Sequence, residues 1–134
     1  MDLNWAFPNV ECNLVPLGGR VIVQLRRIKK TTSGGIVLPG EVREHEKYKN
    51  QVAKVVSHGP LAFRKKDTME PWVEGVWAEP NDFVLVPQYN GSRFEVPVPN
   101  EPDEPVVFML LNDHELIAKV KGDPLGMMYE YVNR

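Results

Sequence analysis

Apolar and polar residues alternate along residues 20–28, which is the pattern of a strand with one face in a hydrophobic core. One face carries Val21, Val23 and Leu25, and the other includes Arg20, Gln24 and Arg26. Short apolar or alternating runs between turn-forming residues predict further strands at 52–56, 83–86, 93–98 and 106–111. Prolines and glycines interrupt the chain too often for a long amphipathic helix. The pattern therefore predicts an all-β domain, either a small barrel or a sandwich.

Three connections between the predicted strands have recognisable turn chemistry. Asn90-Gly91 lies between two of them and favours a tight hairpin turn, because both residues tolerate positive φ. Residues 97–105 are rich in proline and acidic side chains, and we expect an exposed loop because proline cannot donate to a strand ladder. Asn112-Asp113-His114-Glu115 is expected to cap a single helical turn, after which residues 116–120 return to a strand.

An unusual passage over residues 31–40 places the apolar tripeptide Ile36-Val37-Leu38 between Gly34-Gly35 and Pro39-Gly40. One interpretation is a hairpin whose return strand, 36–38, joins the core. The second is a long mobile loop with an exposed apolar tip. Strongly polar residues on both sides isolate the tripeptide from other apolar segments, which favours the loop. Long loops in compact domains are commonly functional.

Composition narrows the functional classes. The chain has 134 residues, 43% hydrophobic and 25% charged, which is typical of one globular domain. A net charge of −2 and a pI near 5.9 give no overall attraction to nucleic acid or an anionic membrane. The single Cys12 excludes an internal disulfide and fits a reducing compartment. No apolar run approaches the roughly 20 residues of a membrane helix, and no secretory signal is recognisable, so a cytoplasmic location is expected.

The sequence offers little support for catalysis. His45, His58 and His114 lie far apart without metal-ligand spacing, and no nucleophile motif or phosphate-binding loop is present. We therefore expect neither an enzyme nor a metal site. The main alternative is a small β-barrel that binds single-stranded nucleic acid. Its groove would be built from two basic clusters and three aromatic residues: 26–30, 64–66, Phe63, Trp72 and Tyr89. A solvated strand end is the favoured interpretation of these basic clusters.

Several segments within residues 15–120 together resemble the GroES co-chaperonin family. The most specific match is Thr32-Ser33-Gly34-Gly35-Ile36-Val37-Leu38-Pro39, which is similar to the family's mobile loop. The other similar segments are 15–23, in which Gly19 stands where Asp is usual, and 52–60, 81–85 and 113–120. Residues 61–78 take the place of the family's roof hairpin without looking like a standard one.

The resemblance implies a small irregular GroES-like β-barrel with a mobile loop over about residues 29–50. This barrel domain, residues 15–120, is flanked by an N-terminal extension, 1–14, and a C-terminal tail, 121–134. Seven subunits would form a homo-heptameric ring that caps a GroEL-type chaperonin in a nucleotide-dependent manner and closes its chamber for protein folding. No cofactor of its own is expected, because ATP or ADP is bound by the partner chaperonin.

The resemblance also implies roles for particular residues. Ile36, Val37 and Leu38 would contact the chaperonin, and Gly34 and Gly35 would act as the loop hinge. The first and last strands would pair between neighbouring subunits, with an interface formed by Leu17, Val21, Val23, Ile117 and Val120.

Two further readings follow from the same resemblance. A GroES-like barrel also occurs as the catalytic domain of medium-chain alcohol dehydrogenases, which makes an enzyme a third possibility, but their zinc ligands and nucleotide-binding domain are absent from the sequence. Divergent co-chaperonins with unusual inserts occur in bacteriophages, and the acidic insert 97–105 suggests the hypothesis of a viral origin and a host cytoplasm.

Overall fold

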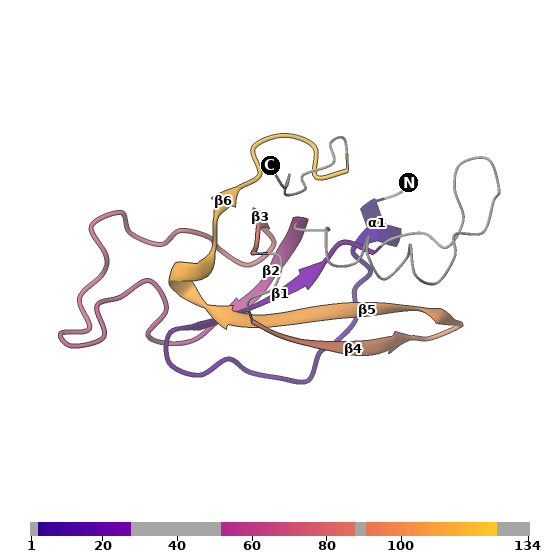
Figure 1. The fold of residues 1–134 in the computed structure, drawn as a ribbon, viewed down its shortest axis with the longest axis horizontal. Helices are drawn as coiled ribbons and strands as arrows, with labels where there is room; N and C mark the ends of the chain where they lie inside the picture. Colours follow the sequence, from indigo (N-terminus) through magenta and orange to yellow (C-terminus); the bar gives the residue numbers. More distant parts are fainter. Residues whose placement is uncertain (1–2, 28–51, 88–90, 126–134) are drawn as a thin grey trace, which may run out of the picture.

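A computed structural model describes residues 3–27, 52–87 and 91–125 of the chain (Figure 1). The elements are α1 (Leu3–Ala6), β1 (Arg20–Leu25), β2 (Val52–His58), β3 (Phe83–Leu85), β4 (Ser92–Val98), β5 (Glu101–Asn112), η1 (Asp113–Glu115) and β6 (Ala118–Lys119). The strands form one six-stranded antiparallel sheet in the order β4-β5-β1-β2-β3-β6. The predicted all-β class is confirmed.

Strand β1 lies at the centre of the sheet and is buried on both faces, so the prediction of one polar face is wrong. Val21, Val23 and Leu25 belong to the main core, as the alternation indicated. On the opposite face, Ile22 packs with Val106 and Phe108, and residues Val10 and Cys12 of the N-terminal segment cover them. Gln24 is buried there too, and its side-chain amide donates a 2.9 Å hydrogen bond to the Pro8 carbonyl oxygen. The N-terminal extension thus supplies a second core layer.

The acidic segment 97–105 belongs to a long β-hairpin, so the prediction of an exposed loop is also wrong. Strands β4 and β5 meet at a tight turn over Pro99 and Asn100, with Val98 opposite Glu101. Asn100 accommodates the turn with φ 69°. The prolines are tolerated because β4 is an edge strand and β5 pairs with β1 only from Phe108 onward. In Figure 1 this hairpin projects beyond the rest of the sheet, at the end where α1 lies.

The prediction of a hairpin connected by Asn90-Gly91 is wrong, because the strands on either side of these residues are not partners. Strand β3 pairs with β2 and β6, whereas β4 pairs with β5. The side chains of Phe94 and Val96 instead lie opposite Phe108 and Val106 of β5. Gly91 does adopt positive φ, 83°, while residues 88–90 lie outside the described part of the chain.

The C-terminal elements agree in part with the sequence pattern. The helical turn is confirmed as η1, and the Glu115 carboxylate accepts a 2.8 Å hydrogen bond from the Asn112 N–H. Strand β6 is shorter than predicted, because it spans only Ala118–Lys119. Farther on, Val120 and Leu125 pack with Phe7 of the N-terminal segment, so both ends of the described chain close the same side of the sheet.

Candidate functional site

The segment that carries the predicted contact tripeptide begins and ends on neighbouring strands. Strands β1 and β2 are antiparallel, with Leu25 opposite Ala53. One residue farther, the Arg26 N–H donates a 3.0 Å hydrogen bond to the Val52 carbonyl oxygen. The chain therefore leaves the sheet after Arg27 and re-enters it at Val52 on the neighbouring strand. The predicted chaperonin contacts at 36–38 and the predicted hinge at Gly34-Gly35 lie outside the described residues.

Arg26 and Arg27, just before this segment, are buried, and the expectation that they form a solvated strand end or a nucleic-acid groove is wrong. The Arg26 guanidinium donates to the Pro124 carbonyl oxygen at 2.8 Å. The Arg27 guanidinium lies 4.3 Å from the ring centroid of Trp5 and 3.1 Å from a carboxylate oxygen of Glu101. Burying a guanidinium without partners would be costly, and these acceptors offset that cost.

The other described residues assigned to the nucleic-acid alternative are divided between the core and the surface. Phe63 is buried in the main core, and Trp72 packs edge-on against it with ring centroids 5.6 Å apart. The Lys66 ammonium is 2.6 Å from the buried carboxylate of Asp113. Tyr89 lies outside the described residues. Phe63 therefore stabilises the core and Lys66 pairs with Asp113, whereas the side chains of Arg64 and Lys65 are exposed.

Asp113 fastens the connection 61–78 to the end of β5. Its carboxylate accepts hydrogen bonds from the Phe63 N–H at 2.9 Å and from Lys66 Nζ. Burial raises the pKa of Asp113, but the bonds from Lys66 and Phe63 outweigh burial, and the pKa lies below its usual value. A Cβ at Gly19 would lie 2.6 Å from Lys66 Nζ, the far end of a flexible side chain that can move, so the contact does not by itself require glycine at this position. Lys66 occupies that space.

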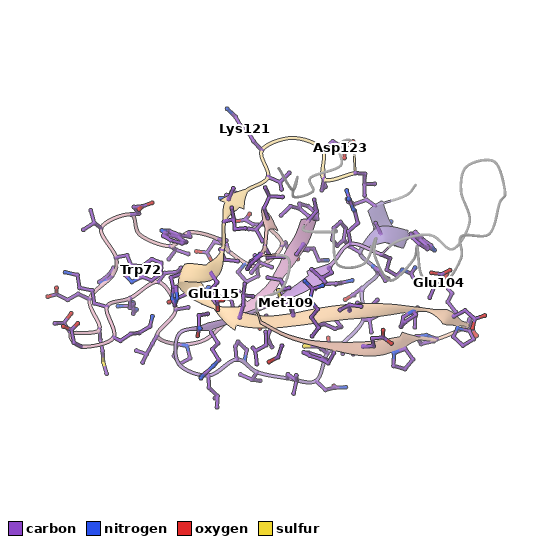
Figure 2. All side chains as sticks on the ribbon, viewed as in Figure 1. Trp72, Glu104, Met109, Glu115, Lys121 and Asp123 are labelled. Carbon is purple, nitrogen blue, oxygen red and sulfur yellow. The ribbon has the colours of Figure 1, made fainter. Side chains whose placement is uncertain are left out.

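The connection 61–78 is a short irregular hairpin at the end of the molecule opposite the β4–β5 tip. Arg64 and Pro71 form an isolated antiparallel bridge, and the Trp72 N–H donates to the Phe63 carbonyl oxygen at 3.1 Å. Figure 2 shows Trp72 at this end and Glu104 at the opposite one. A hairpin is therefore present in the place where the resemblance implied a roof hairpin, with an aromatic base that the sequence pattern did not predict.

The residues predicted for a subunit interface separate into two groups. Val21 and Val23 are fully buried within their own chain, so their side chains have no surface for a neighbour. Leu17 is 70% exposed and Ile117 52% exposed, and Val120 is half-buried. Ile117 lines a groove beside the edge strand β6, which Val76, Trp77 and Leu116 also line. Exposed Leu14 and Val15, which were not predicted, extend the apolar surface before β1.

Neither a cluster of candidate metal ligands nor a helix that could span a membrane is found in the described part of the chain. Residues 3–27, 52–87 and 91–125 contain no group of three or more histidine, cysteine or acidic side chains arranged to hold a metal. In the same ranges, no helix is long and apolar enough to cross a membrane.

The fold and these surfaces define a class: a small all-β subunit with exposed apolar side chains before its first and last strands and a long segment inserted between β1 and β2. Residues 13–120 match the family described as "Chaperonin 10 Kd subunit". The chain belongs to this family of co-chaperonins.

Individual relatives agree with this assignment. The co-chaperonin GroES of Acetivibrio thermocellus is 50% identical over 83 residues, which cover 60% of this chain and 77% of the relative. The co-chaperonin GroES of Clostridium botulinum strain Hall is 34% identical over 112 residues, which cover 82% of this chain and 99% of the relative.

Proposed function

We propose that this protein caps a GroEL-type chaperonin ring in a nucleotide-dependent manner and closes its chamber for protein folding. The observation that carries the proposal is the position of the apolar tripeptide Ile36-Val37-Leu38, within a long segment that starts and ends on the adjacent strands β1 and β2. Family membership supports the same activity. Fully extended, the chain from Arg27 to Ile36 spans at most about 30 Å, which is enough for the tripeptide to reach beyond the body of the subunit.

The energetics favour a function that uses several copies of this tripeptide at once. Complete burial of three aliphatic side chains contributes about 4 to 9 kcal/mol. Ordering even six backbone residues costs about 6 to 12 kcal/mol, so one isolated segment binds weakly. In a ring, the first docked segment raises the effective concentration of the others to about the millimolar range, and weak contacts add up to useful but reversible affinity. Gly34 and Gly35 act as the hinge that permits docking.

The ring is formed by contacts between unlike surfaces of neighbouring subunits. The apolar stretch around Leu17 precedes β1, and Ile117 precedes β6. In Figure 1 the stretch before β1 runs along the opposite side of the sheet from β6. A contact between two different surfaces is heterologous, and it closes into a ring when the rotation between subunits is suitable. We propose a homo-heptamer in the cytoplasm, with Leu17, Ile117 and Val120 at the interface and the ATP or ADP bound by the chaperonin.

Electron microscopy of the protein mixed with a GroEL-type chaperonin tests the proposal. Caps are expected on the rings with ADP or ATP and not without nucleotide. Ile36→Ser and Leu38→Ser are expected to abolish capping while the circular dichroism spectrum and the melting temperature of the protein stay unchanged. Loss of folding in these variants would instead support a core strand at 36–38. Absence of caps on the wild-type mixture, together with salt-sensitive binding to single-stranded nucleic acid, would favour the alternative function.

A further inference from the structure

Arg27 is held by two parts of the chain that are distant in sequence. From the N-terminal side, the Trp5 carbonyl oxygen accepts a 2.7 Å hydrogen bond from Arg27 Nε, and the indole ring of Trp5 lies under the guanidinium. From the tip of the β4–β5 hairpin, the Glu101 carboxylate and the Glu104 carbonyl oxygen accept bonds from Arg27 Nη1 at 3.1 and 2.8 Å. Both supports lie at the end of the sheet where β1 finishes.

The arrangement fixes both the side chain and the backbone of Arg27. Its side chain is only 3% exposed, and a buried guanidinium is stable only where its donors have partners. The planar fork of nitrogen atoms allows few orientations that satisfy three acceptors and a ring together. The Arg27 N–H donates to the Ala6 carbonyl oxygen at 2.9 Å, so the backbone also lies against α1. Little freedom remains at the last described residue before segment 28–51.

We propose that Arg27 is a positioning residue for chaperonin docking. It fixes the point and direction in which the chain leaves β1 toward the tripeptide, and α1 and the tip of the β4–β5 hairpin are its supports. The proposal rests on the proposed capping function. Its physical basis is preorganisation: a chain end that is already fixed loses less conformational entropy when the tripeptide docks, and the saving is repeated in every subunit. It also assigns a role to the N-terminal extension and to the acidic hairpin tip.

Two substitutions at the same hairpin tip separate positioning from general effects of charge. Glu101→Ala removes a carboxylate that pairs with Arg27, at a residue whose side chain is 38% exposed, so the fold should survive. Glu104→Ala is the matched control, because it removes the same charge nearby while the carbonyl oxygen that binds Arg27 remains. Glu101→Gln keeps an acceptor oxygen and should recover part of the loss. Trp5→Leu weakens the support from the other side.

The variants are compared with wild type in three measurements: melting temperature, amide hydrogen exchange at Arg27, and apparent affinity for a GroEL-type chaperonin with nucleotide. Glu101→Ala and Trp5→Leu should each speed exchange at Arg27 and weaken capping roughly threefold or more, because the loss is repeated around the ring. Glu104→Ala should leave exchange and capping near wild type. If wild type caps the chaperonin and Glu101→Ala caps as well as Glu104→Ala, positioning by Arg27 is refuted. If wild type itself does not cap, the proposed function fails instead.

Discussion

Replacement of Asp113 by alanine is expected to destabilise the subunit by about 1 to 4 kcal/mol. The Asp113 side chain is 1% exposed, and its loss leaves the buried Phe63 N–H without its acceptor. An unsatisfied buried donor costs about 1 to 3 kcal/mol. The ion pair with Lys66 adds less than about 1 kcal/mol, because the Lys66 side chain is 51% exposed and water screens the pair. The hydrogen bond to the backbone therefore outweighs the ion pair.

Lys66→Met is the matched control, because it removes the ammonium and keeps the apolar stem that lies near Trp72. Its expected cost is about 1 kcal/mol or less. Urea unfolding followed by tryptophan fluorescence gives both values, since Trp72 and Trp77 pack against Phe63. All variants must be compared at one protomer concentration, because oligomerisation shifts the apparent stability. Equal losses for Asp113→Ala and Lys66→Met would refute the reasoning and place the stabilisation in the ion pair.

Two further predictions concern acid stability and assembly. The folded-state pKa of Asp113 lies below its reference value of 3.8, so its contribution to the free energy of unfolding is present above about pH 4 and disappears as the pH falls through the folded pKa. Urea midpoints measured from pH 6 to pH 2 should therefore fall less steeply for Asp113→Asn than for wild type, and parallel curves would contradict this. Ile117→Asp should convert the proposed ring into smaller species in native mass spectrometry. The control Leu3→Asp changes another exposed apolar residue and should leave the mass of the assembly as in wild type. An unchanged assembly mass for Ile117→Asp would remove Ile117 from the interface.

The basic cluster before residue 28 shows what a linear pattern leaves out. Arg26 and Arg27 follow the strand in sequence and resemble a solvated end, as adjacent arginines usually do. Their acceptors, the Pro124 carbonyl oxygen and the Glu101 carboxylate, lie far away in sequence. Nothing in a local window indicates such partners, so the burial of the two arginines could not be predicted.

The hairpin of β4 and β5 shows the same limit for strands. Pro97 and Pro105 correctly indicated residues that do not donate to a ladder, but the inference of an exposed loop assumed neighbours on both sides. At the edge of a sheet a strand has one neighbour, and proline fits there. Likewise, Asn90-Gly91 has turn chemistry, but pairing depends on which apolar side chains find partners, and Phe94 finds Phe108 instead of a residue in β3.

The amino-acid sequence by itself determined the features that depend on residues close together in the chain. These are the all-β class, the inward face of β1 at Val21, Val23 and Leu25, the helical turn at 113–115 and the unusual apolar tripeptide at 36–38. Only the tertiary structure decided that the N-terminal extension covers the other face of β1, that Lys66 fills the space beside Gly19, and that two arginines are buried at the base of segment 28–51. Those outcomes depend on contacts between distant segments, whose desolvation and pairing no local period encodes.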